Sequence, residues 1–155
     1  MEPIDDQAVA RAWSAYRAAS GDPEPEPTDV VQFGDSAAMA DELLALVLDG
    51  TKRATAGLVR DSTPERRPRP GWPWLVCDGA GTPRAVLRTT EVRTGLLDSV
   101  DDAFAWDEGE GDRTRASWLE GHLRYFLRQG EREGVPFDPA SDEVLFERFE
   151  LVWTA

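Results

Sequence analysis

The chain has 155 residues, of which 41% are hydrophobic and 30% charged, and its formal net charge is −13. This length and composition are typical of one globular domain with its own core. No apolar run reaches the roughly 18 residues of a membrane span. The acidic start of the chain shows no apolar signal segment, and the single cysteine, Cys77, excludes an internal disulfide. We therefore expect a cytoplasmic protein.

The charges are unevenly distributed along the chain. Residues 1–51 carry 11 acidic and 2 basic side chains, residues 94–155 carry 15 and 6, and residues 52–93 carry 4 and 9. The net charge argues against a non-specific binder of long nucleic acid, because such binding depends on Lys and Arg contacts to phosphate. The basic middle segment has two interpretations: a cleft that attracts one anionic group, or arginines in a solvated loop.

The first third of the chain predicts two helices joined by an extended connector. Residues 5–20 have apolar residues at helical spacing and precede Gly21, which is typical of a helix end. Residues 22–27 contain three prolines, each after an acidic residue, and predict an extended segment. Residues 36–49 have an apolar stripe and end at Gly50, so they predict a second helix.

The rest of the chain predicts most of the strands. Three segments have β-propensity: residues 53–59, 74–77 and 84–93. Between the first two lies a loop rich in proline and arginine, and long loops in compact domains are often functional. Two further helices are predicted at residues 98–107 and 112–133. Residues 143–153 are apolar on both faces and predict a central strand. Because strands cluster instead of alternating with helices, the order favours an α+β fold.

Catalytic motifs of the common hydrolase, metalloprotease and nucleotide-binding classes are absent, and one His with one Cys does not predict a zinc site. The segment Gly50-Thr51-Lys52-Arg53-Ala54-Thr55 lies where a helix turns into a strand. A lysine beside apolar walls has a lowered pKa and can act as a base. A threonine hydroxyl beside that base can attack a substrate or orient a water. The Lys-x-x-Thr spacing alone is common and decides nothing.

An acidic segment, Asp107 to Arg113, is the second candidate. Its five charged residues are too costly to bury unpaired. Three interpretations stay open: oxygen ligands for a divalent cation, positioning of a substrate, or a structural role in capping the next helix and pairing with arginines. His122, the only histidine, lies four residues after Trp118 on a predicted helix, where both a packing role and a functional role are possible.

Several blocks, in order, resemble the ASCH domain: Phe33 to Ser36, Gly50 to Thr55, Arg88 to Val92, and Glu108 to Arg113 followed by Trp118 and His122. The resemblance covers residues 13–153. We therefore interpret residues 1–155 as a single ASCH domain, in which residues 1–30 form an N-terminal helix and a Pro-rich connector.

The resemblance implies a PUA-like fold, which is a small β-barrel with flanking helices, and a link to RNA. Longer relatives act as ribonucleases on single-stranded RNA. A shorter relative removes the acetyl group of N4-acetylcytidine with a lysine, a threonine and a glutamate. The corresponding catalytic residues here are Lys52, Thr55 and, on a predicted strand, Glu91.

The chain departs from the amidohydrolase in two respects. Ala56 and Gly57 follow the threonine where many relatives have hydroxyl residues, and the shorter enzyme lacks the acidic segment and the long C-terminal helix. A ribonuclease is therefore the first hypothesis, with the amidohydrolase and a non-catalytic nucleotide-binding module as alternatives. The expected partner is RNA, a nucleoside or a nucleotide and not a membrane, and a divalent cation is the only cofactor considered. The expected substrate-binding residues are Arg53, Trp72, Glu108, Glu110, Asp112, Arg113, Trp118 and His122.

Overall fold

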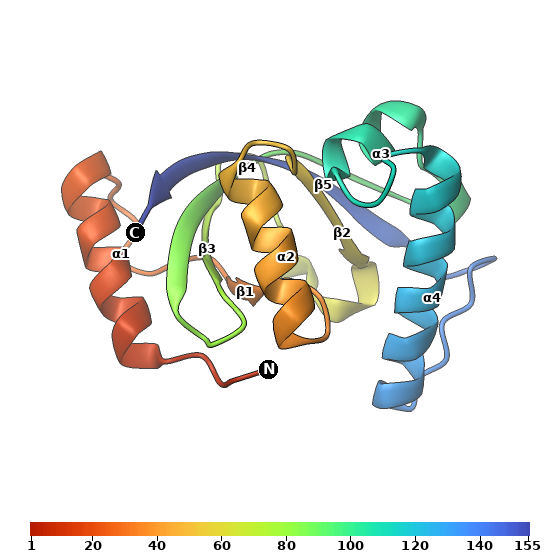
Figure 1. Cartoon of the computed structure of the whole chain (residues 1–155), viewed down its shortest axis with the longest axis horizontal. Helices are drawn as coiled ribbons and strands as arrows, with labels where there is room; N and C mark the ends of the chain where they lie inside the picture. Colours follow the sequence, from red (N-terminus) through yellow and green to blue (C-terminus); the bar gives the residue numbers. More distant parts are fainter.

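The computed structural model describes residues 1–155 as one curled, mixed sheet of five strands with four α-helices around it (Figure 1). The strand order is β1-β3-β4-β5-β2, in which β1 runs parallel to β3 and all other neighbours are antiparallel. The sheet curls into a half-barrel around its two long strands, β4 and β5. This architecture confirms the predicted α+β, PUA-like fold with flanking helices.

The four α-helices lie close to their predicted positions. Each begins at a residue whose side chain accepts a backbone N–H of the first turn, which satisfies an otherwise unpaired donor. None of the helices is both long and apolar enough to cross a membrane. Their bounds are α1 Asp6–Ser20, α2 Ala37–Leu48, α3 Asp102–Glu108 and α4 Arg115–Glu133.

Four of the five strands were predicted, and β1 was missed. β1 spans only three residues, too few to show an alternating pattern, and it depends on long-range pairing with β3. The predicted loop after β2 contains two short 3₁₀ turns, and a third such turn precedes α3. The strands are β1 Val30–Gln32, β2 Ala54–Leu58, β3 Pro73–Cys77, β4 Pro83–Gly95 and β5 Val144–Thr154.

The sheet buries apolar side chains on both faces. Helix α1 packs Trp13 and Tyr16 against β3 and β4, whereas α2 packs against another group of strand residues that includes Phe149. Helices α3 and α4 form a third cluster around Phe146, at the β2 side of the sheet. Helices α2 and α4 therefore flank one part of the sheet (Figure 1).

Candidate functional site

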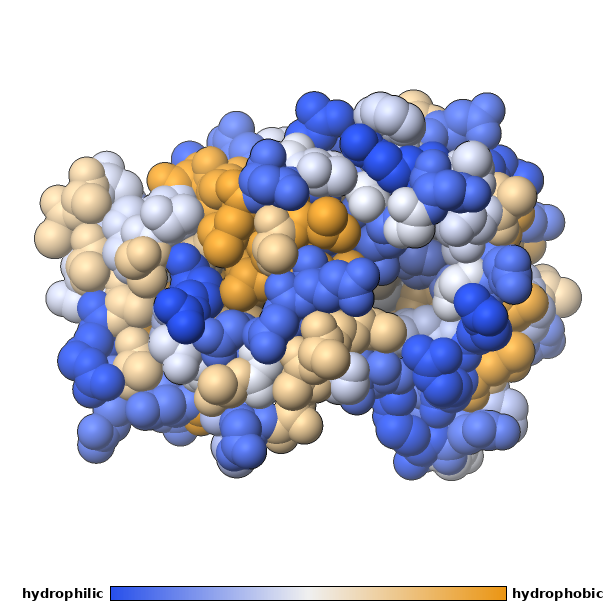
Figure 2. Space-filling view, viewed as in Figure 1, coloured by the Kyte–Doolittle hydropathy of each residue, from blue (hydrophilic) through white to orange (hydrophobic).

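A cavity of about 760 Å³ is lined by α2, α4, the sheet and the loop after β2. This volume lies within the roughly 300–1,000 Å³ of small-molecule sites. Figure 2 shows the surface hollowed between the α2 and α4 sides of the molecule. Polar side chains from separate elements meet in the lining, among them Lys52, Thr55, Thr89, Glu108, Glu110 and Glu147, and three arginines also line it: Arg66, Arg124 and Arg128.

Lys52 is buried, with 2% of its surface exposed. Gly50, in the left-handed conformation at φ 86°, turns the chain after α2, and the backbone N–H of Lys52 then donates to the Leu46 carbonyl at 3.0 Å. The Nζ atom donates to the Ala54 carbonyl at 2.8 Å and to the carboxylates of Glu108 and Glu110, each at 3.2 Å. All three ammonium hydrogens therefore have partners.

The charge state of Lys52 differs from the prediction. Burial alone would lower its pKa, but the negative charges and hydrogen bonds of Glu108 and Glu110 outweigh burial and raise the pKa above its ordinary value. Lys52 is therefore held as an ammonium ion. Of the two roles expected of Lys52 in a ribonuclease, a base for the 2′-hydroxyl or a group that stabilises the developing charge on phosphorus, this charge state favours the second.

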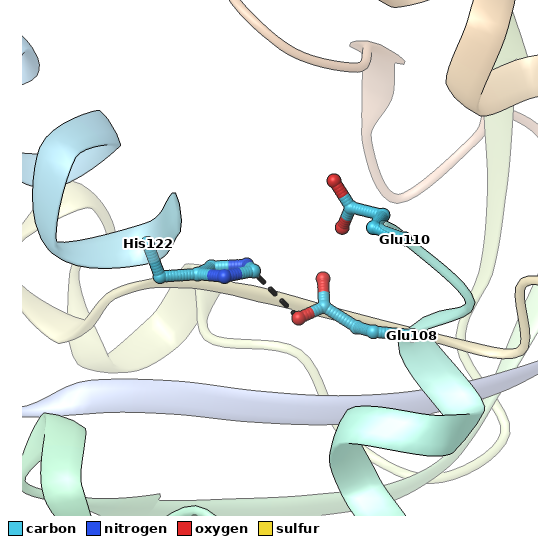
Figure 3. Close-up of side chains that lie close together, drawn as sticks. All are labelled: Glu108, Glu110 and His122. Carbon is cyan, nitrogen blue, oxygen red and sulfur yellow. Dashed lines mark ion pairs between the residues drawn. The ribbon is translucent and has the colours of Figure 1, made fainter. Parts of the chain in front are cut away.

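Glu108, the last residue of α3, joins Lys52 to α4. It is 2% exposed and accepts hydrogen bonds from Lys52 and from the indole N–H of Trp118. His122 Nε2 lies 2.9 Å from Glu108 Oε2 (Figure 3). Burial acts to raise the pKa of Glu108, but the charges of His122 and Lys52 outweigh it and lower that pKa. Glu108 is therefore an anion within the protein.

His122 has no free ring nitrogen. Nδ1 lies 2.9 Å from the Trp118 carbonyl and Nε2 faces Glu108, so both nitrogens have acceptors. Burial would lower the pKa of His122, but Glu108 outweighs burial and raises it. The ring also stacks on Trp118, with centroids 3.9 Å apart. Both acceptors favour the protonated ring, so His122 pairs with Glu108 and packs on Trp118 while it lines the cavity.

Glu110 is the exposed member of this cluster. Its side chain is 31% exposed and lines the cavity, and burial together with the neighbouring Glu108 charge raises its pKa. Glu108, Glu110 and His122 offer possible metal-ligand atoms within 4.8 Å of one another (Figure 3). The Lys52 ammonium already lies 3.2 Å from both carboxylates, where it would repel a divalent cation. The donor set therefore fits an internal ion cluster better than a metal centre.

Glu147 is a cavity residue that the sequence analysis missed. It lies on β5 directly opposite Thr55 of β2 and is 7% exposed. The Thr89 hydroxyl donates to Glu147 Oε2 at 2.5 Å, and the Trp74 indole N–H donates to that hydroxyl at 3.1 Å. Burial raises the pKa of Glu147 to about 7, with a further contribution from the Asp29 charge. The signal that could have found it is a glutamate within a strand of otherwise largely apolar, buried residues.

The structure brings seven of the eleven predicted site residues to the cavity. Two of them are aromatic: Trp118 is 5% exposed and packs in the core, whereas Trp72 is half-buried near the loop arginines. Trp72 is therefore the better candidate for stacking on a base. The seven are Lys52, Thr55, Trp72, Glu108, Glu110, Trp118 and His122.

Three predicted residues beside the cluster have structural contacts instead. Arg53 pairs with Asp107 at 2.8 Å. Asp112 accepts from the backbone N–H of Thr114 at 2.9 Å, just before α4. Arg113, at φ 65°, stacks on Trp106 with its guanidinium 3.7 Å from the ring centroid. The interpretation that the acidic segment caps the next helix and pairs with arginines therefore applies to the residues at its two ends. Glu108 and Glu110, which lie between them, reach the cavity.

Glu91 is the fourth predicted residue outside the cavity. An irregularity in the pairing of β4 and β5 lies between Thr89, which is opposite Phe149, and Glu91, which is opposite Arg148. In an unbroken register Glu91 would be opposite Glu147, on the cavity face, because side chains alternate along a strand. The irregularity places Glu91 opposite Arg148 instead. There its carboxylate lies 3.3 Å from the Arg148 guanidinium, and its side chain is 59% exposed.

Comparisons with known proteins identify the family. The ASCH domain model matches residues 29–153, so the chain belongs to the ASCH domain family. The crystal structure of protein EF3133 from Enterococcus faecalis V583 is 29% identical over 96% of this chain and 90% of that one, with a TM-score of 0.84. The ASCH domain from Lactobacillus crispatus JV V101 is 24% identical over 96% and 95% of the two chains, with a TM-score of 0.81. No curated protein matches the chain.

Membership of this family links the chain to RNA in general terms. ASCH domains have a PUA-like fold that is often associated with RNA binding, and the five-stranded half-barrel has that fold. The cavity, with its buried Lys52, is the part of this fold where ionisable side chains from separate elements meet.

Proposed function

We propose that the protein hydrolyses single-stranded RNA, with one nucleotide inserted in the cavity and Lys52 stabilising the charge of the transition state. The observation that carries this proposal is the buried Lys52 ammonium in the cavity lining, held charged by Glu108 and Glu110. A fixed positive charge in a site shielded from water stabilises an oxyanion far better than a solvated one does. Cleavage of a phosphodiester develops such a charge on the phosphoryl oxygens.

Lys52 already binds one displaceable anion. The Glu110 carboxylate lies 3.2 Å from Nζ and is partly exposed, whereas Glu108 is fixed by Trp118 and His122. A phosphoryl oxygen that displaces Glu110 would take over its hydrogen bond. The displaced carboxylate, with its raised pKa, would accept the 2′-hydroxyl proton as that oxygen attacks phosphorus. The bond from phosphorus to the 5′-oxygen breaks, the 5′-oxygen takes a proton from water, and the resulting 2′,3′-cyclic phosphate is opened by a water molecule in a second step.

The rest of the cavity lining favours a single strand. Arg66, Arg124 and Arg128 are exposed cations that would contact the phosphates of neighbouring nucleotides, Arg124 and Arg128 in exchange for their ion pairs with Glu120 and Asp35. Trp72 offers an aromatic ring on which an unpaired base would stack. A cavity that admits one splayed-out nucleotide excludes a base-paired one.

Amide hydrolysis on a modified nucleoside is a second candidate, favoured by the acidic groups of the cavity. Three carboxyl groups, those of Glu108, Glu110 and Glu147, line the cavity beside the two cations Lys52 and His122, so a neutral acyl group would enter with less repulsion than a phosphate. Lys52 would then polarise the carbonyl, and the Thr55 hydroxyl or a water would attack it.

The decisive experiment incubates the protein with labelled single-stranded RNA and, separately, with N4-acetylcytidine. The test variant is the double replacement of Lys52→Met and Glu108→Gln, which removes both charges of the buried pair; His122 then loses its anionic partner and with it the interaction that raises its pKa. We expect it to lose roughly 100-fold or more in rate. Arg84→Met, which removes an exposed cation paired with Asp78 outside the cavity, should leave the rate unchanged.

The substrates separate the candidates. Turnover of RNA alone supports the ribonuclease, and turnover of the nucleoside alone supports the amidohydrolase. Binding without turnover of either substrate, or full activity in the double variant, would overturn the proposal and favour a non-catalytic nucleotide-binding module.

A further inference from the structure

The part of the cavity around Glu147 has chemistry that the proposed reaction does not use. Glu147 is 7% exposed, lines the cavity opposite Thr55, and forms no ion pair. Its only hydrogen-bond partner in the protein is Thr89. A buried carboxyl group without a cation is unfavourable unless hydrogen-bond donors satisfy it.

The hydrogen bonds around Thr89 fix the orientation of Glu147. An indole N–H can only donate, so the Trp74 contact uses a lone pair of the Thr89 hydroxyl and directs its proton to Glu147 Oε2. Glu147 Oε1 has no partner in the chain. The only side-chain polar atom that is both sealed from solvent and unpartnered is Nε of Arg67. Oε1 is therefore an oriented acceptor that opens onto the cavity.

The surroundings of Oε1 favour a ligand that donates hydrogen bonds. Asp29, an exposed carboxyl, also lines the cavity and forms no ion pair, and its charge helps to raise the pKa of Glu147 to about 7. Thr55 provides a hydroxyl from the opposite strand. A ligand atom that carries lone pairs would be repelled by these carboxyl groups, whereas an N–H group would be attracted.

We propose that Glu147, oriented by Thr89, accepts a hydrogen bond from the exocyclic amino group of cytosine or adenine. This inference rests on the proposed function, in which one nucleotide enters the cavity, and adds a base preference to it. Carboxylates pair with the cytosine amino group in nucleic-acid recognition. Uracil and hypoxanthine carry a carbonyl oxygen at the corresponding ring position, so they would be disfavoured.

Two pairs of mononucleotides test this inference, because each pair differs in whether an amino group or a carbonyl occupies that position. They are CMP with UMP and AMP with IMP, titrated calorimetrically at pH 8. We expect the wild-type protein to bind the amino member of each pair roughly tenfold more tightly. In Glu147→Gln the amide can present either its oxygen or its N–H to the cavity, so the ratio should fall to about twofold or less.

Two further variants complete the design. Thr89→Val keeps the shape of the side chain but frees the Glu147 carboxylate to rotate, so it should also reduce the ratio of the two affinities in each pair. If Glu147→Gln does not fold, Thr89→Val alone tests the inference. Glu150→Gln, which removes an exposed carboxylate on the same strand, should keep the wild-type ratio.

The outcomes distinguish this inference from the proposed function. If both members of each pair bind the wild-type protein equally, or if Glu147→Gln and Thr89→Val keep the wild-type ratio, the role of Glu147 is refuted and the nucleotide cavity stands. If none of the four nucleotides binds, both proposals fail.

Discussion

Lys52 and Glu147 are two buried ionisable residues in one cavity, and their neighbours set opposite conditions for them. Lys52 has two carboxylates within 3.2 Å, which hold its charge. Glu147 has only the Thr89 hydroxyl, so burial raises its pKa to about 7. The first arrangement suits electrostatic stabilisation and the second suits a ligand-dependent hydrogen bond. Each makes a measurable contribution to folding.

Replacing Lys52 alone should strongly destabilise the protein. Lys52→Met leaves Glu108 with one of its two cationic partners, and breaking a buried ion pair costs roughly 3–5 kcal/mol. Urea denaturation should show this loss, and Glu108→Gln added to Lys52→Met should recover part of it. The matched control is Arg53→Met, an exposed pair with Asp107, which should cost less than about 1 kcal/mol. If Lys52→Met and Arg53→Met lowered the free energy of unfolding equally, the buried ion pair would contribute no more than the exposed one, contrary to this prediction.

Glu147 should make stability fall with rising pH. Its folded pKa of about 7 exceeds the ordinary pKa of a glutamate, 4.5, so the folded state binds more protons than the unfolded state between these values. The wild-type protein should therefore lose roughly 3 kcal/mol relative to Glu147→Gln as pH rises from 4 to 8. Urea denaturation of both proteins across this range measures the difference. A difference that does not change with pH would refute the raised pKa.

At the same scale, the sequence could nominate residues but not their contacts. Lys52, Glu108 and Glu110 were all candidates, because charged residues in short distinctive segments are visible in a sequence. Their pairing in space is not visible in the sequence, since α3 and the turn after α2 are about 55 positions apart. Glu91 was selected through the family resemblance, but a strand irregularity, which no local pattern signals, turns its side chain to the other face of the sheet.

At the scale of elements, the segment between α3 and α4 positions the cluster. Gly109 ends α3 in the left-handed conformation at φ 75°, and a Cβ there would lie 2.7 Å from the Thr51 carbonyl oxygen. Glu108 and Glu110 on either side of it both reach Lys52. The close approach of two backbones therefore requires glycine at this position.

Gly109→Ala should separate the acidic segment from Lys52. The clash is with backbone, which cannot move aside cheaply, so we expect lower thermal stability and loss of most of the hydrolytic rate. Gly134→Ala is the control, since Gly134 also has a positive φ, of 70°, but open space around it. It should cost only about 1 kcal/mol of backbone strain and keep the rate. Similar melting temperatures for the two variants would contradict this role of Gly109.

Most elements followed from local signals, because caps, glycine stops and apolar periodicity are encoded within each segment. Asp5, Ser36 and Thr114 cap helices that the sequence located to within a few residues. The strand β1 and the first residue of α3 could not be found in this way. β1 has three residues and takes its stability from β3, and a 3₁₀ turn occupies the start of the predicted α3.

At the scale of the whole molecule, the basic middle segment does not form a continuous surface. Half of its eight arginines form ion pairs, such as Arg84 with Asp78 and Arg88 with Asp22. Of these arginines only Arg66 lines the cavity, where α4 contributes Arg124 and Arg128. A protein with net charge −13 and three such arginines should recognise RNA locally.

The salt dependence of RNA binding should therefore be shallow. With up to three phosphate contacts, each contributing about 0.7 to the slope for single strands, log K against log salt should have a slope no steeper than about −2. Fluorescence anisotropy with a labelled cytidine octamer between 50 and 200 mM salt measures it, with the Arg124→Met variant expected to reduce the slope. A slope steeper than about −4 would indicate an extended RNA surface elsewhere.

The most direct test of the cavity as the RNA site is to fill it. Gly57 lines the cavity on β2, two residues after Thr55, and a Cβ there would meet nothing within 4 Å. Gly57→Phe should therefore place a ring in the cavity with the melting temperature unchanged. We expect that this variant neither binds nor cleaves single-stranded RNA. Full binding and cleavage by a folded Gly57→Phe protein would contradict it.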